Sequence, residues 1–369
     1  MKYIDLIDSL TENAKKIISN GIEVEYRNCI DREEGSIDPR TKIASYLTKS
    51  DFENNIIDIP EELVRNREKL LGPENPELLT DLEIFRKQFG WRSQDITDDI
   101  SCKKIYKDEY KVIIYNNRNE VKLKPCLFFI HGGGFFAGDV QTVENQCKLI
   151  SKLGKSMVVS IDYPLSPEVK YPTALNVCMK VITDFYNNYK TYGINKDKFA
   201  IAGDSAGGNL ALACCLKSRD EGSNMIKYQG LIYPAVSFAG FGEKNYFWNK
   251  GNYNNKNNIK KIDDEIRVIG DLNKKVVDWY FTNENDKFDR YATMIDKELK
   301  NLPKTTIFTA EYDFLREQDE VFAKRLIASN VDARIIRYGG IFHGTFDRLG
   351  YSPQVEDIIK EISKELLSL

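Results

Sequence analysis

Short apolar runs alternate with amphipathic segments in the middle of the chain and again toward its C-terminus. The apolar runs have the length and β-branched content of buried strands, whereas the longer segments repeat apolar residues at helical spacing. Strands separated by helices pair in parallel, because a parallel neighbour requires a crossover connection. We therefore expect an α/β fold with strands near 111–115, 126–130, 157–161, 199–202, 305–309 and 333–338, and helices near 142–153, 172–189, 206–217, 318–329 and 353–367.

Changes in this pattern near residues 95, 235 and 298 divide the 369-residue chain into four parts. Residues 1–95 are dense in charge, have a mostly helical pattern and contain no catalytic motif. Residues 96–235 and 299–369 carry the alternation, so we expect them to form the two halves of one core. Residues 236–298 lie between these halves and have the character of an insertion. Within this insertion, residues 245–258 are rich in Asn, Lys and aromatic residues. That segment is either a surface loop or a lid over a site.

Charge and hydropathy exclude several classes of function. The chain has 53 basic and 56 acidic residues, so no electrostatic footprint for nucleic acid or anionic lipid is expected. No apolar run approaches the roughly 18 residues of a membrane-spanning helix, and the first residues lack the apolar centre of a secretory signal. Cysteines occur without CxxC or metal-ligand spacing, which favours reduced thiols in a cytoplasmic protein over a disulfide framework or a zinc site. The seven are Cys29, Cys102, Cys126, Cys147, Cys178, Cys214 and Cys215.

The sharpest local motif is Gly203-Asp204-Ser205-Ala206-Gly207-Gly208-Asn209 (GDSAGGN), which follows an apolar run and opens a helix rich in small residues. This strand–turn–helix context is that of a nucleophile elbow, in which a strained turn projects the serine above the sheet edge. Gly203 and Gly207 lack side chains that would collide with the neighbouring strand and helix. Ser205 is therefore the candidate nucleophile, and a plain tight turn between strand and helix is the alternative.

A second motif, His131-Gly132-Gly133-Gly134, directly follows the predicted strand near 126–130. Consecutive glycines expose backbone N–H groups that can point at one oxygen atom, as a developing oxyanion requires. The N–H of Ala206, just after the candidate nucleophile, would complete this set of donors. A phosphate-binding loop is the competing interpretation, but neither GxGxxG spacing nor a following GK[ST] is present.

A serine hydroxyl needs a base, and the chain has only two histidines. His131 leads the glycine loop, where it is expected to hold the loop in shape, so His343 is the base by elimination. In a nucleophile-elbow fold the acid lies between the serine and the histidine in sequence. Asp313 follows a predicted strand and is the preferred acid, with Glu311 and Asp319 as rivals.

These motifs, in this order, resemble the hormone-sensitive-lipase-like (HGGG/GDSAGG) branch of the α/β-hydrolase carboxylesterases, from about residue 96 to the C-terminus. The resemblance implies an α/β-hydrolase fold with a mostly parallel eight-stranded sheet under a helical cap. The cap would be built from the N-terminal segment and the insertion. Residues 162–168 (DYPLSPE) would shape a turn rather than take part in chemistry. The chain departs from the usual family pattern at Glu317, where Asp is common, and at Thr345, where Phe is common.

The resemblance also implies a catalytic triad and its surroundings. The triad would be Ser205, Asp313 and His343, with oxyanion donors from the residues Gly133, Gly134 and Ala206. The implied activity is a serine carboxylesterase that hydrolyses small, short-acyl esters through an acyl-enzyme, with no cofactor and no metal. An amidase, a peptidase or an acetylated-sugar deacetylase would use the same triad. A non-catalytic ligand-binding protein on the same fold is a further alternative, although such proteins lack the catalytic histidine.

Overall fold

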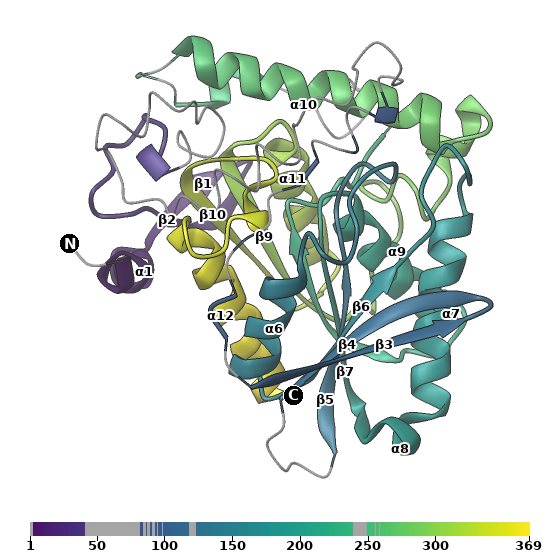
Figure 1. Ribbon diagram of the computed structural model, residues 1–369. Helices are drawn as coiled ribbons and strands as arrows, with labels where there is room; N and C mark the ends of the chain where they lie inside the picture. Colours follow the sequence, from purple (N-terminus) through teal and green to yellow (C-terminus); the bar gives the residue numbers. More distant parts are fainter. Residues whose placement is uncertain are drawn as a thin grey trace.

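The computed structural model describes residues 3–40, 99–117, 123–238 and 249–369 except 255 and 258, together with scattered positions between 82 and 97. Within these described residues, ten strands form one sheet in the order β1-β2-β10-β9-β8-β7-β5-β6-β4-β3 (Figure 1). The pairs from β2 to β6 across the centre are parallel, and the pairs at both edges are antiparallel. The strands are β1 (Lys15–Ser19), β2 (Ile22–Arg27), β3 (Ile100–Lys107), β4 (Tyr110–Asn117), β5 (Lys124–Ile130), β6 (Met157–Asp162), β7 (Ile194–Asp204), β8 (Ile226–Ile232), β9 (Lys304–Tyr312) and β10 (Ala333–Phe342).

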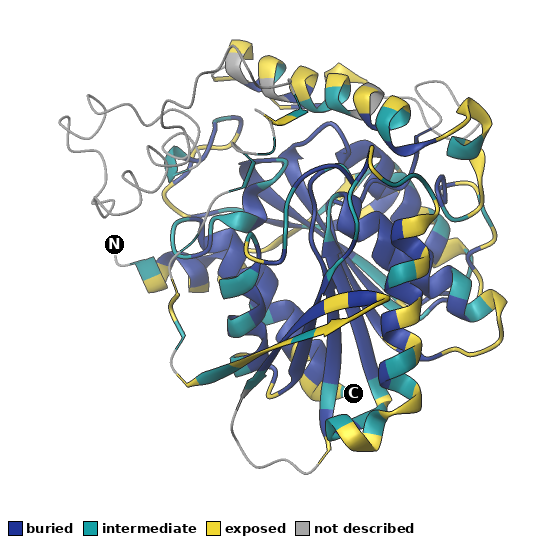
Figure 2. Cartoon of the chain, turned by 45° about the vertical axis from the view of Figure 1, so that its right-hand side comes forward, coloured by how far each residue is buried: buried dark blue, intermediate teal, exposed yellow. Residues whose placement is uncertain are grey.

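Helices cover both faces of the sheet and create two hydrophobic cores. Helices α7, α9 and α11 pack on one face, and α1, α6 and α12 pack on the other. Because successive side chains of a strand point to opposite faces, Phe128 of β5 enters the first core and Phe129 the second. The central strands are buried on both sides (Figure 2), which explains their continuous apolar runs. The helices are α1 (Tyr3–Glu12), α6 (Glu144–Leu153), α7 (Thr173–Asn187), α8 (Tyr189–Tyr192), α9 (Ala206–Asp220), α10 (Ile259–Tyr280), α11 (Arg316–Ala328) and α12 (Pro353–Ser368).

The predicted α/β-hydrolase fold is confirmed, but in the part of the chain that the structure describes the sheet has ten strands rather than eight. Strands β3 to β10 supply the expected eight. The additional two form an N-terminal hairpin, in which β2 pairs in parallel with β10. The expectation that residues 1–95 are mostly helical is therefore wrong for this hairpin. Its turn, Asn20-Gly21, has both residues at positive φ, which is the signature of a two-residue hairpin loop.

The insertion contributes α10, a 22-residue helix that runs across the end of the sheet where the parallel strands terminate (Figure 1). Ile262 and Ile266 on its inner side are buried. Gly270 approaches the ring of Phe314, which follows β9. Of the loop predicted over 245–258, residues 249–254 include a short 3-10 helix, η2 (Lys250–Asn252), and 245–248 lie outside the described residues. Among the described helices, none is both long and apolar enough to cross a membrane.

Candidate active site

Ser205 occupies a sharp turn between β7 and α9, with φ 54° and ψ −116°. A non-glycine residue at positive φ is strained, and this strain persists because the surrounding backbone fixes it. A Cβ added at Gly203 would lie 2.4 Å from the Gly207 carbonyl oxygen, and one added at Gly207 would lie 2.0 Å from the carbonyl oxygen of Ile130. Both glycines are thus required by close backbone approach, as the motif predicts.

The structure brings the three predicted triad residues together from the ends of three strands. His343 follows β10, and its Nε2 lies 2.7 Å from the Ser205 hydroxyl oxygen. Its Nδ1 lies 2.7 Å from the carboxylate of Asp313, which follows β9. Asp313 is fully buried, and its other carboxylate oxygen accepts the backbone N–H of Leu315 at 2.8 Å. With the imidazole proton on Nδ1, Nε2 is an acceptor for the serine hydroxyl.

The two rival acids have other partners. The Glu311 carboxylate accepts hydrogen bonds from the Arg32 guanidinium and from the backbone N–H of Gly340. Asp319 lies on α11, where it accepts a hydrogen bond from the Thr309 hydroxyl. Burial, and then the nearby Asp313 carboxylate, raise the pKa of Asp319 well above its usual value. Of the three carboxylates, Asp313 is the one that hydrogen-bonds the imidazole of His343.

The glycine loop after β5 is a tight turn closed on itself. The N–H groups of Phe136 and Ala137 both donate to the Gly133 carbonyl, at 3.1 and 2.8 Å. Gly133 and Gly134 have positive φ, and among the described residues we find no acceptor for their N–H groups. Ala206 is the first residue of α9, a position whose N–H has no acceptor within the helix.

Asp204 ties the glycine loop to the nucleophile elbow. Its carboxylate accepts the backbone N–H of Gly132 at 2.9 Å. Although part of this residue reaches solvent, its carboxyl group is surrounded by protein, and the loss of hydration raises its pKa to about 7. The hydrogen bond from Gly132 opposes that shift. Asp204 is therefore a titratable group beside the candidate nucleophile, a property that its place in the motif did not indicate.

His131 lies against the glycine loop that it precedes. Its Nδ1 lies 2.8 Å from the Gly132 carbonyl oxygen, and its ring stacks on Tyr163 at 4.4 Å between centroids. The Tyr163 hydroxyl donates to the His131 carbonyl at 3.0 Å. Burial lowers the pKa of His131, so the neutral form is favoured. The backbone N–H of Ser166 donates to the Phe135 carbonyl at 2.8 Å, so the segment 162–168 supports the loop.

Two supporting residues were not predicted. Arg86, in the N-terminal part, donates from Nε to the Phe136 carbonyl at 2.6 Å and from Nη2 to the Ser166 carbonyl at 2.6 Å. No sequence motif marks this arginine. Asn209 ends the GDSAGGN motif, and its buried side chain donates to the carbonyls of Ala235 and Ala292. Its place in that motif was the available signal.

The arrangement can perform acyl transfer. It combines a hydroxyl held against an imidazole, a buried carboxylate on the other imidazole nitrogen, and backbone donors beside the hydroxyl. Its elements converge at the carboxyl ends of parallel strands, where α/β sheets bind ligands. Among the described residues, no cluster of three His, Cys, Asp or Glu side chains could hold a metal ion.

Several known proteins are similar to this chain in sequence or in fold. Residues 127–347 match a family described as having the alpha/beta hydrolase fold. The arylesterase of Saccharolobus solfataricus is 32% identical over 237 residues, which cover 64% of this chain and 73% of the arylesterase. Versiconal hemiacetal acetate esterase of Dothistroma septosporum is 31% identical over 239 residues, covering 64% of this chain and 71% of that esterase. A solved hyperthermophilic esterase from Pyrobaculum calidifontis superposes with a TM-score of 0.64 at 31% identity, covering 73% and 85% of the two chains.

Proposed function

Since the chain belongs to the hormone-sensitive-lipase-like branch of the α/β-hydrolase family and is a carboxylic ester hydrolase, we propose that it cleaves small, short-acyl esters through an acyl-enzyme on Ser205. The observation that carries this proposal is the hydrogen-bonded chain from Ser205 through His343 to Asp313, with both distances at 2.7 Å. These are the contacts that a serine nucleophile needs to lose its proton and that an imidazole needs to keep one tautomer.

In the proposed reaction His343 takes the proton from Ser205 as the hydroxyl oxygen attacks the ester carbonyl. The Asp313 carboxylate stabilises the imidazolium that forms. His343 then gives the proton to the departing alcohol oxygen, which breaks the ester bond and leaves an acyl-serine. A water molecule then enters, and its oxygen attacks the acyl carbonyl while His343 takes one of its protons. The bond between the acyl carbon and the Ser205 oxygen breaks, His343 returns the proton to that oxygen, and the carboxylic acid leaves.

The negative charge on the carbonyl oxygen would be stabilised by the N–H groups of Gly133, Gly134 and Ala206. Support comes from the first two having no acceptor among the described residues and from the third lying at the N-terminus of α9. That helix terminus adds a favourable dipole for a developing anion. Each such donor contributes about 2.7–4 kcal/mol to transition-state stabilisation in comparable sites.

Aromatic packing beside the glycine loop supports the preference for short acyl groups. Phe135, the residue after Gly134, stacks on Tyr280 at the end of α10, with ring centroids 3.8 Å apart. Phe136 makes an edge contact with Trp279, and Phe238 makes one with Phe135. These rings fill space next to the proposed oxyanion donors, so a long acyl chain would have to displace them.

A panel of p-nitrophenyl esters of increasing acyl length tests the proposal, with p-nitroanilides and acetylated sugars as further arms. We expect hydrolysis of the acetyl and butyryl esters, a steep decline with longer chains, and loss of all hydrolysis in Ser205→Ala. Faster cleavage of anilides or sugar acetates would transfer the assignment to an amidase or a deacetylase. The hydrogen-bonded His343 argues against a ligand-binding protein without catalysis.

A cytoplasmic location stays a prediction. Its support is that the seven cysteines are free thiols, six of them buried. Free thiols are typical of proteins in reducing compartments.

A further inference from the structure

The strand that leads to His343 contains an irregularity at Gly340. The pairing of β10 with β9 shifts register between Tyr338 and Phe342, and Gly340 lies at φ +76°. Its backbone polar groups are therefore turned away from the regular ladder. The N–H of Gly340 donates to the Glu311 carboxylate at 2.8 Å, and its carbonyl accepts the N–H of Asp38 at 2.9 Å. The Glu311 side chain of β9 and the loop that follows β2, residues 28–38 (here the N-terminal loop), thus hold this bulge.

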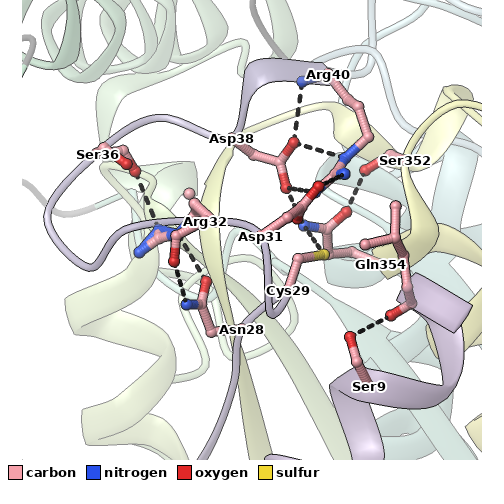
Figure 3. Close-up of polar contacts among 12 residues, drawn as sticks. Ser9, Asn28, Cys29, Asp31, Arg32, Ser36, Asp38, Arg40, Ser352 and Gln354 are labelled. Carbon is pink, nitrogen blue, oxygen red and sulfur yellow. Dashed lines mark hydrogen bonds and ion pairs between the residues drawn. The ribbon is translucent and has the colours of Figure 1, made fainter. Parts of the chain in front are cut away.

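Arg32 of the N-terminal loop completes the contact. Its side chain is fully buried, and both Nη atoms lie 2.8 Å from the same Glu311 oxygen. The other guanidinium hydrogens go to Asn28, to the Ser36 carbonyl and to the Tyr26 hydroxyl. Figure 3 shows Arg32 held between Asn28 and Ser36. All five donors of the guanidinium are used, so Arg32 has one defined position.

The two glycines before His343 make room for this loop. A Cβ added at Gly339 would lie 2.7 Å from the Asn28 side-chain oxygen, and one added at Gly340 would lie 2.5 Å from Cδ of Arg32. The loop therefore lies directly on the backbone of β10, three residues before the proposed base. A displacement of Arg32 would therefore remove the contact that holds the β10 backbone at Gly340 in place.

The same loop also contacts the start of α12, beyond His343. Asp38 accepts hydrogen bonds from Arg40 at 2.9 and 2.8 Å and from the Gln354 side chain of α12 at 2.9 Å (Figure 3). His343 lies on the connection between β10 and α12. The N-terminal loop is consequently attached at both ends of the segment that carries the proposed base.

We propose that Arg32 and Glu311 form a clamp that positions the acid and the base of the triad relative to each other. Glu311 lies two residues before Asp313 on β9, and it binds the backbone three residues before His343 on β10. This inference rests on the proposed function, because the clamp acts only through these two residues. Geometry controls such a site strongly, since a displacement of about 1 Å can cost about 10²-fold in rate.

The test compares Arg32→Met with Glu311→Gln, with the double variant and with a matched control, Arg27→Met. Arg27 comes from β2 and is equally buried, but it binds Asp357 and Glu361 on α12, away from the triad. Rates are normalised to active sites counted by stoichiometric reaction with a fluorophosphonate, so that unfolded molecules do not contribute. Melting temperatures are measured for each variant.

We expect Arg32→Met to lower kcat per active site about 10²-fold with little change in KM. Glu311→Gln keeps an oxygen acceptor for Gly340 with a weaker hydrogen bond, so its loss is smaller, about tenfold. The double variant recovers activity relative to Arg32→Met, because it leaves no unpaired carboxylate under the bulge. Arg27→Met melts at a lower temperature but keeps the wild-type kcat.

Wild-type kcat per active site in Arg32→Met and Glu311→Gln would overturn the clamp, as would an equal loss of kcat in Arg27→Met. If Arg32→Met does not fold, the comparison of Glu311→Gln with Arg27→Met decides the question. Hydrolysis that survives Ser205→Ala would instead contradict the proposed function, and with it the clamp. Hydrolysis that requires Ser205 but is insensitive to both clamp variants contradicts the clamp alone.

Discussion

Replacing Gly133 by alanine tests the proposed oxyanion donors most sharply. The added Cβ would lie 2.0 Å from the Ala137 carbonyl oxygen and 2.5 Å from its carbon. Because Cβ contacts below 3.0 Å essentially never occur, the two atoms must separate by at least about 1 Å. The turn closed by the hydrogen bonds from Phe136 and Ala137 to the Gly133 carbonyl cannot survive that movement unchanged. The N–H groups of Gly133 and Gly134 are then redirected.

Loss of one oxyanion donor costs about 10²–10³-fold in kcat, equivalent to about 2.7–4 kcal/mol. We expect Gly133→Ala to lose at least this much in kcat, with a small change in KM, because the donors act mainly on the transition state. The assay is steady-state hydrolysis of p-nitrophenyl butyrate, normalised to titrated active sites.

Gly222→Ala is the matched control. Gly222 also has positive φ, at +73°, but an added Cβ would meet nothing within 4 Å. Its replacement costs only the backbone penalty of about 1–2 kcal/mol in stability and leaves kcat unchanged. A Gly133→Ala enzyme with kcat within about threefold of wild type would refute the assignment of the glycine loop as the oxyanion hole.

Three further predictions concern the groups around Ser205. Asp313→Asn should lower kcat about 10⁴-fold by favouring the wrong imidazole tautomer, well beyond the loss in Glu311→Gln; the opposite ranking in the same assay would make Glu311 the acid. Burial raises the pKa of the Asp204 carboxyl group from 3.8 to about 7 in the folded protein. Protonation of this group therefore stabilises the folded state; that stabilisation is complete below the pKa of the unfolded chain and is lost as the pH rises through about 7. Asp204→Asn, which keeps an acceptor for Gly132, should therefore melt above wild type at about pH 8 but not at about pH 4; an equal difference at both pH values would contradict the assignment. His131→Asn should reduce kcat by disturbing the glycine loop, yet leave the acid limb of the pH–rate profile in place. His343→Asn should abolish activity. If the acid limb instead depends on His131, then His131 is the base and His343 is not.

Local patterns predict the strands and helices of the core because each of these elements has its own periodicity. The helix expected near 206–217 and the strand expected near 126–130 lie within α9 and β5. The hairpin β1–β2 was missed although Asn20-Gly21 is a strong turn signal, since charged residues surround it and β1 is largely exposed. Strand β8 was missed because its run contains Lys227 and Gln229; the latter is buried and hydrogen-bonds Thr305.

The candidate triad could be predicted because each member lies in a short motif or is one of very few residues of its type. The proposed clamp could not be predicted from the sequence, because Arg32 and Glu311 are 279 positions apart and neither belongs to a motif that specifies the other. The same reason applies to Arg86, which reaches the carbonyls around the glycine loop from an N-terminal segment without catalytic motifs. Contacts of this kind arise from the folded arrangement and carry no local periodicity.

Covalent labelling tests the central claim, which is that Ser205 is the nucleophile activated by His343. The protein is treated with a fluorophosphonate, and intact mass and peptide mapping by mass spectrometry locate the adduct. The account predicts one adduct per chain on Ser205, none in Ser205→Ala, and strongly slowed labelling in His343→Asn, because the hydroxyl loses its base. An adduct on another residue, or undiminished labelling of Ser205→Ala, would contradict it.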